Sequence, residues 1–198
     1  DIMNKIENAV AFAERIARDD SHGYDQKDRW GNPDYDCSGL VIDSCQRAGI
    51  PVKSNGATYT GNMYSIFKKT GFKDVTKTVN LVTGEGLKRG DVLLRRNHHT
   101  AFYCGNGRMV HARINEKGTI IGGKKGDQTG HEIEISNYAD CKWTDVLRYE
   151  EAPLKSVYEV ALECIAGRYG NGAYRRQKLT QMGYNYKEVQ AEVNKLLK

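Results

Sequence analysis

The apolar residues change along the chain from helical spacing to short strands, and this change limits the folds that the chain can adopt. In residues 4–18 they recur every three or four positions, as in a helix with one buried face. After Gly90, short apolar segments separated by glycines and polar residues indicate strands at 91–94, 100–104, 109–112, 132–135 and 143–149. Helices followed by strands predict an α+β domain, with N-terminal helices packed on a small antiparallel sheet.

Residues 34–51 predict a further helix with Cys37 on its first turn. Asp34 or Asp36 can cap its N-terminus, and Gly49 can adopt the left-handed conformation that ends it. A thiol at the positive end of the helix dipole is favoured as the thiolate, which is the nucleophilic form. Cys37 is therefore a candidate catalytic nucleophile. The alternative is that it is a small buried residue at the start of a helix.

The composition indicates a folded chain without a membrane-spanning segment. Of the 198 residues, 39% are hydrophobic and 28% are charged, which argues against disorder. No apolar segment is long enough to span a bilayer, and the first residues show no signal-peptide pattern. Five cysteines without a CxxC pair predict synthesis in a reducing cytoplasm and at least one free thiol.

Beyond residue 150 the pattern becomes helical again. Three helices are expected within 157–198, and Asn185 and Glu188 have the spacing of a capping box at the start of the last one. Three short helices of this kind form a small bundle. The chain therefore divides into a first domain at 1–150, a linker at 151–156 and a second domain at 157–198.

Positive charge is concentrated in this C-terminal part. The net charge is +5, and from Leu154 onward there are eight lysines and arginines but four glutamates. This excess favours an acidic partner such as nucleic acid or an anionic cell wall, although solvated helix faces produce the same count. The aromatic residues do not alternate with basic ones as an RNA-binding sheet requires, so the sequence does not favour nucleic acid.

His98, His99 and His111 are candidates for the base that a cysteine nucleophile requires. With a two-residue turn between the two strands, His99 and His111 face opposite sides of the sheet, and His98 is the better base. With a three-residue turn over residues 105–107, His99 and His111 are diagonal neighbours about 7–8 Å apart on one face, and His99 is the base. Both turns are compatible with the sequence, and so is a purely structural role for these histidines.

Other chemistries lack the residues that they need. No histidine has zinc-like spacing to a cysteine or carboxylate, and the lysines near residue 124 lack the P-loop spacing. No pair of carboxylates indicates a glycosidase. The sequence therefore predicts no metal and no cofactor.

Two segments resemble the NlpC-type peptidoglycan peptidases, a family of papain-like enzymes. Asp36-Cys37-Ser38-Gly39-Leu40-Val41 is similar to the nucleophile motif of that family. The order and spacing of residues 90–93, 99–103, 105–107 and 111–112 are similar to those of its histidine hairpin. The resemblance covers most of residues 20–150 and implies a papain-like fold.

By this resemblance Cys37 is the nucleophile, His99 is the general base, and His111 is the polar residue that orients the imidazole of His99. The resemblance also implies the three-residue turn. The oxyanion-stabilising tyrosine of the family matches Tyr24, although residues 25–33 differ from the common family pattern. The backbone N–H of Cys37 supplies a second donor to the oxyanion.

The C-terminal part resembles the cell-wall-binding repeat of Cpl-seven-type phage lysozymes. The similarity rests on Ile165-Ala166-Gly167-Arg168-Tyr169-Gly170-Asn171-Gly172, Arg175, Leu179, Gly183-Tyr184 and Val189-Gln190. It implies a three-helix bundle that binds a muropeptide carboxylate through Arg175 and the glycan through backbone donors of Gly170, Asn171 and Gly172. The alternatives are that these three residues form a tight turn and that Arg175 is a solvated side chain.

Together the two resemblances imply a bacteriophage endolysin, a bacteriolytic cysteine endopeptidase that cleaves a stem-peptide amide. The implied bond joins D-glutamate or D-isoglutamine to the diamino acid. The alternatives are an N-acetylmuramoyl-L-alanine amidase with the same residues and a non-catalytic wall-targeting protein. The implied partner is bacterial peptidoglycan, with no nucleic acid, no membrane insertion and no obligate protein partner. Such a protein is made in the bacterial cytoplasm without a signal peptide and acts on the wall after release.

Overall fold

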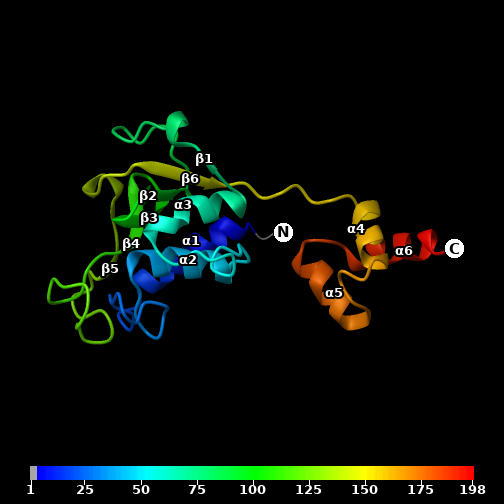
Figure 1. Cartoon of the computed structure of the whole chain (residues 1–198), viewed down its shortest axis with the longest axis horizontal. Coiled ribbons are helices and arrows are strands. Elements are labelled where there is room, and N and C mark those ends of the chain that lie inside the picture. The colour runs from blue at the N-terminus through cyan, green and yellow to red at the C-terminus, as the bar shows by residue number, and fades with distance from the viewer. Residues whose placement is uncertain (1–3) are drawn as a thin grey trace. The chain divides into compact units, whose positions relative to one another are not determined.

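A computed structural model describes residues 4–198, which form two compact units, 4–151 and 152–198 (Figure 1). Residues 1–3 of the first expected domain lie outside the described residues. The first unit contains helices and a sheet, whereas the second is helical. In the described part of the chain, no helix combines the length and the apolar character needed to cross a membrane.

The first unit is built on a six-stranded antiparallel sheet with the order β1-β6-β2-β3-β4-β5. Its strands are β1 (Phe72–Asp74), β2 (Val92–Arg95), β3 (His99–Gly105), β4 (Arg108–Ala112), β5 (Ile133–Asn137) and β6 (Asp145–Tyr149). Five of these strands lie where the sequence predicts them. The sequence does not predict β1, because three residues with a single buried side chain give no readable alternation.

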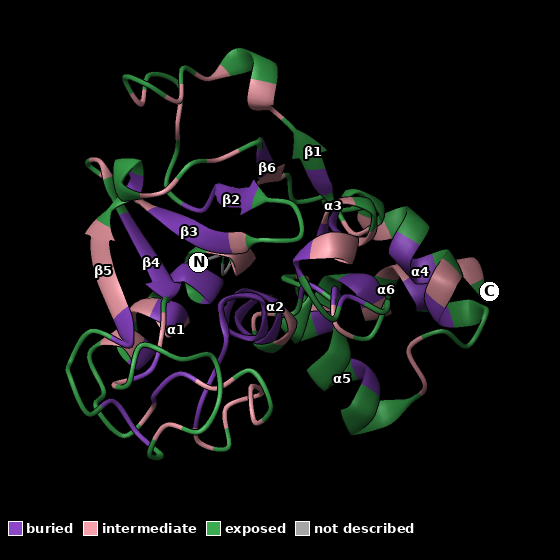
Figure 2. Cartoon of the chain, turned by 60° about the vertical axis from the view of Figure 1, so that its left-hand side comes forward, coloured by how far each residue is buried: buried purple, intermediate pink, exposed green. Residues whose placement is uncertain are grey.

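Three helices pack on one face of this sheet, namely α1 (Lys5–Ala17), α2 (Cys37–Arg47) and α3 (Thr60–Lys69). α1 and α2 pack on the part formed by β3, β4 and β5, and α3 packs on the part formed by β1, β2 and β6. α2 is the most deeply buried of them, because every residue from Cys37 to Cys45 is buried (Figure 2). The predicted α+β fold, with N-terminal helices on a small antiparallel sheet, is confirmed.

The opposite face of the sheet carries a second apolar core that irregular chain covers. Its buried members are Leu93, Ala101, Tyr103, Met109, Tyr138 and Val146. Partly buried residues between 75 and 87 and between 141 and 143 pack over them. Because side chains alternate along a strand, His99 and His111 belong to this face of the sheet, together with Ala101 and Met109.

The hairpin between β3 and β4 combines one of the two turns that the sequence allows with the register expected from the other. Its turn has two residues, Asn106 and Gly107, both with positive φ, as a type I′ turn requires. A β-bulge at Cys104 then shifts the register, so that Tyr103 is paired with Met109. The three-residue turn is therefore wrong, but the register expected from it is present, because the bulge supplies the extra residue.

The second unit is a bundle of α4 (Val157–Ile165), α5 (Gly172–Gln181) and α6 (Tyr186–Leu196). Its small core consists of Val160, Ala161, Cys164, Leu179, Val189 and Val193. This arrangement confirms the predicted three-helix bundle.

The capping box predicted for the last helix does not form. The Asn185 carboxamide oxygen accepts from the backbone N–H of Lys187 at 3.0 Å, and its amide nitrogen donates to Glu188 at 3.3 Å. A capping box is present instead at the start of α4, between Ser156 and Glu159. At α4 the Ser156 hydroxyl accepts from the backbone N–H of Glu159, the third helical residue, and this closes the box.

Asp91, which follows Gly90 at the start of β2, is buried in a paired state. Two nitrogens of the Arg148 guanidinium donate to its two carboxylate oxygens at 2.7 and 2.6 Å, and the backbone N–H of Lys88 donates at 2.8 Å. The Asp91 side chain is 1% exposed, so water cannot replace these donors. Arg148 lies on β6, so this ion pair neutralises the buried Asp91 charge and links β6 to the start of β2.

We expect Arg148→Leu to lower the free energy of unfolding of the first unit by about 3–5 kcal/mol, because it leaves the buried Asp91 charge without its partner. Both tryptophans lie in this unit, so urea unfolding followed by tryptophan fluorescence measures its stability. Arg95→Leu, at an exposed position of β2, is the control and should change stability by no more than about 0.5 kcal/mol. Equal losses for the two variants would contradict the role of the pair.

Candidate active site

The start of α2 is fixed by a cap and by a close backbone approach. The Asp36 carboxylate accepts from the backbone N–H of Gly39 at 2.5 Å, as an N-cap residue does. A Cβ on Gly39 would lie 2.1 Å from the Arg29 carbonyl oxygen, so only glycine fits where the loop crosses the helix. These contacts hold Cys37 as the first residue of the helix.

The Cys37 thiol is buried at the point where α2 meets β3. The nearby backbone N–H of Thr100, the residue after His99, and those of Ser38 and Cys37 favour the thiolate. Burial, and secondarily the nearby Asp36 carboxylate, raise the pKa of Cys37 to about 12 in spite of these donors. The thiolate expected from the helix dipole is therefore outweighed by desolvation, and the resting thiol is neutral.

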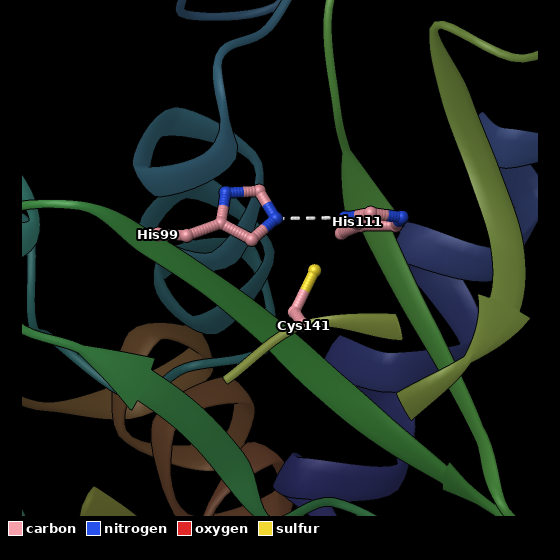
Figure 3. A group of neighbouring side chains, drawn as sticks. All are labelled: His99, His111 and Cys141. Atoms are coloured by element: carbon pink, nitrogen blue, oxygen red, sulfur yellow. Dashed lines mark hydrogen bonds between the residues drawn. The ribbon is translucent and has the colours of Figure 1, made fainter. Parts of the chain in front are cut away.

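His99 and His111 lie side by side, as Figure 3 shows. His99 Nε2 and His111 Nδ1 are 2.7 Å apart, and their rings meet edge to face. Burial, and secondarily His111, lower the pKa of His99, and burial, followed by Arg113, lowers that of His111. His98 is exposed and takes no part in this contact. Of His98 and His99, the two alternatives for the base, only His99 is thus in contact with His111.

Two neighbours that the sequence did not indicate hold the histidine pair. Glu134 Oε1 and Ser136 Oγ, both from β5, lie 3.2 Å from His111 Nε2. An ionised carboxylate can only accept, so the proton of neutral His111 lies on Nε2 and its Nδ1 accepts from His99 Nε2–H. The lone pair of His99 is then on Nδ1. On the other side, Trp143 stacks on His99 with ring centroids 5.8 Å apart.

Tyr24 is buried close enough to Cys37 for the two groups to interact electrostatically. Burial raises the pKa of Tyr24 to about 12, so that its hydroxyl remains protonated and can donate. The Tyr24 backbone N–H donates to buried Glu132 at 2.8 Å, and Gly23 and Gly126 both donate to Asp34. The loop that carries Tyr24 is thereby tied to the segment before β5, despite its departure from the family pattern.

A third chemically active side chain, Cys141, lies next to the histidine pair (Figure 3). Its Sγ and one ring nitrogen of each histidine all lie within 4.8 Å of one another. Sequence analysis missed this residue because it is thirty positions beyond His111 and has no spacing motif. It packs over the second core from the segment between the short 3-10 turn at Tyr138–Asp140 and β6.

The four residues expected to bind the wall are held together, but Arg175 does not face solvent. Its guanidinium is buried and donates to the carbonyl oxygens of Gly170 and Cys164, the Asn171 side chain and the Gln190 side chain. This burial shows that the alternative of a solvated side chain is wrong, whereas binding of a muropeptide carboxylate by Arg175 stays a prediction. Gly170, Asn171 and Gly172 form the corner before α5, and Asn171 and Gly172 are exposed. The corner therefore remains a candidate surface, and Arg175 holds its shape.

The comparisons with known families agree with these two units. Residues 31–110 match the model of the endolysin-like domain, a segment that contains Cys37 and His99 and ends one residue before His111. Over this segment the first unit is thus similar to the endolysin-like domain. Residues 158–197 match the model of the CW_7 repeat, which is the second unit. The predicted combination of an endolysin-type domain with a cell-wall-binding repeat is confirmed. No curated protein matches the chain.

The solved structures that the chain matches include proteins from Trichomonas vaginalis and from two mycobacteria. NlpC1 from Trichomonas vaginalis is 16% identical, with a TM-score of 0.47 over 74% of this chain and 44% of that one. The peptidoglycan hydrolase RipB from Mycobacterium tuberculosis is 21% identical, with a TM-score of 0.47 over 76% and 69%. A P60 domain from Mycobacterium avium subspecies paratuberculosis is 17% identical, with a TM-score of 0.44 over 75% and 96%. The chain spans less than half the length of the two matched Trichomonas proteins.

We expect Gly39→Ala to destabilise the first unit by about 1–3 kcal/mol, because the added methyl group meets the Arg29 carbonyl and must displace the loop or the helix start. Urea unfolding followed by tryptophan fluorescence measures the effect. Ser65→Ala, on the exposed face of α3, is the control and should stay within about 0.5 kcal/mol of the wild type. A wild-type stability for Gly39→Ala would show that the close approach is not a constraint.

Arg175→Leu should destabilise the second unit by at least about 2 kcal/mol, because it leaves several buried acceptors without a hydrogen-bond donor. The neighbouring Arg176→Leu is a matched control: Arg176 is exposed and contacts the ring of Tyr186, an interaction of about 0.5–1 kcal/mol. Hydrogen exchange at the amides of α4, α5 and α6 reports this unit separately. Faster exchange in the Arg176 variant than in the Arg175 variant would overturn the assignment.

Proposed function

We propose that the chain is a peptidoglycan hydrolase of the endolysin type, with a cysteine nucleophile in its first unit and a wall-binding module in its second. The observation that carries this proposal is the thiol of Cys37 at the start of α2, which packs against β3, the strand that carries His99 of the His99–His111 pair. The matches to the endolysin-like domain and to the CW_7 repeat support the wall as the target.

In the proposed mechanism, His99 Nδ1 receives the Cys37 thiol proton as the sulfur attacks the carbonyl carbon of the substrate amide. His111 accepts from His99 Nε2–H, and Glu134 accepts from His111 Nε2–H, so that this chain of bonds stabilises the imidazolium. The Tyr24 hydroxyl and the Cys37 backbone N–H donate to the oxyanion. His99 then protonates the leaving amine, and water hydrolyses the thioester to regenerate Cys37.

The neutral resting state of these groups fits a site that is activated by substrate. Burial disfavours charge on both the thiol and the imidazole, so the proton moves when the developing oxyanion is stabilised. A desolvated site also strengthens the hydrogen bonds of the oxyanion hole. The resting thiol is therefore expected to be less reactive than the helix dipole alone would make it.

The bond that we propose as the target joins D-glutamate or D-isoglutamine to the diamino acid of the stem peptide. The amide between muramic acid and L-alanine is the alternative, because the same residues can attack either carbonyl. The second unit is proposed to hold the enzyme on the muropeptide, with the exposed corner at Asn171 and Gly172 as its contact surface. In this proposal a bacteriophage lysin is made in the bacterial cytoplasm and acts on the wall after release.

The experiment is mass spectrometry of purified sacculi after digestion with the wild type and single variants. We expect new amino termini on the diamino acid, and at least about a 1,000-fold loss of product for Cys37→Ala and for His99→Ala. His98→Ala and Cys104→Ala, which alter an exposed histidine and a thiol outside the site, should keep the activity.

Other products would change specific parts of the proposal. New termini on L-alanine would identify an amidase with the same site. Loss of activity in Cys141→Ala with full activity in Cys37→Ala would identify Cys141 as the nucleophile. A wild type that binds sacculi without releasing products would identify a non-catalytic wall-targeting protein.

A further inference from the structure

We propose that His99, His111 and Cys141 form a binding site for a zinc ion, and that the bound ion inhibits the peptidase. The three ligand atoms come from three separate segments, β3, β4 and the stretch before β6, and Figure 3 shows all three side chains directed toward one point. Two imidazole nitrogens and one thiolate are ligands that zinc prefers. The zinc-binding part of this inference is independent of the proposed function, whereas the inhibition depends on it.

The distances suit a tetrahedral ion after a small adjustment. Zinc bonds of about 2.0–2.1 Å to nitrogen and 2.3 Å to sulfur separate tetrahedral ligands by roughly 3.3–3.6 Å. The three ligand atoms here lie within 4.8 Å of one another, and two ring nitrogens, His99 Nε2 and His111 Nδ1, are 2.7 Å apart. The two rings must therefore separate by roughly 0.6 Å, which side-chain rotation provides. A water molecule would complete the tetrahedron.

The surroundings of the cluster match those of established zinc sites. A histidine that binds zinc through one ring nitrogen normally donates its other N–H to a carboxylate, and this fixes the ring. His111 has this arrangement, because Glu134 Oε1 lies 3.2 Å from His111 Nε2. Cys141 and His99 are partly exposed, which leaves a route for the ion from solvent. Glu134 therefore accepts from His111 Nε2–H both with and without a bound ion.

Inhibition follows from the position of one proton on His99. Without the ion, His99 Nε2–H donates to His111 and Nδ1 carries the lone pair that receives the Cys37 proton. Zinc takes the Nε2 lone pair, so the ring proton moves to Nδ1, and the Cys141 thiol releases its proton to solvent. His99 then has no lone pair for the thiol of Cys37, and the enzyme loses its base until the ion leaves.

Binding is tested on the full chain with cobalt(II) and zinc(II) salts alone. Cobalt should give one equivalent of a thiolate-to-metal charge-transfer band in the near ultraviolet, and zinc should displace it. Cys141→Ser should abolish this band, and Cys104→Ser, which removes a half-buried thiol outside the cluster, should retain it. Glu134→Gln should weaken zinc binding by about 10- to 100-fold. A band that survives in Cys141→Ser, or is lost in Cys104→Ser, would overturn the site.

Inhibition is tested by sacculus digestion at increasing free zinc, with each variant compared with its own metal-free rate. The zinc concentration for half inhibition should equal the dissociation constant from the binding experiment and rise at least about 10-fold in Cys141→Ser. Binding without inhibition would refute the proton argument while leaving the site intact. A wild type that binds the metal but never cleaves sacculi would refute the proposed function and not the metal site.

Discussion

The register between β3 and β4 is the constraint on which the candidate active site depends. A two-residue turn by itself would place His99 and His111 on opposite faces of the sheet, where they could not touch. The bulge at Cys104 shifts the pairing by one residue and brings both imidazoles to the same face, with nitrogens 2.7 Å apart. The contacts that orient the pair, from Glu134 and Trp143, are possible only in this register. One extra residue in a strand thus determines whether the two imidazoles can touch.

Much of the fold was accessible from the sequence because it rests on local patterns. Apolar spacing predicts α1 and α2, the cap at Asp36 predicts where α2 begins, and the glycines near residue 106 predict the hairpin. β1 escaped prediction because three residues carry too little pattern, and the bulge escaped because nothing in the local sequence distinguishes it from a longer turn. The capping box at Asn185 failed because a shared spacing does not ensure the geometry.

The residues of the candidate site show the same contrast between local sequence pattern and non-local contact. Cys37, His99, His111 and Tyr24 were predicted as site residues because of a resemblance to a family pattern, and their roles stay predictions. Glu134, Cys141 and Trp143 were missed, because their contacts with the histidines arise from strand pairing and from chain that folds over the second core. Burial also reversed one expectation: the helix dipole favours the thiolate of Cys37, but desolvation is the larger effect and raises its pKa. The residue types of a site can be read from a sequence, but the desolvation that the fold imposes on them cannot.

The buried Arg175 couples the exposed corner of the second unit to the interior of the bundle. Its donors reach the backbone of Gly170 and the side chain of Asn171 on one side, and a carbonyl of α4 and a side chain of α6 on the other. The shape of the corner therefore exists only while the helices are docked. Undocking of the helices would therefore break the hydrogen bonds that hold the corner, so that its shape is coupled to the stability of this small module.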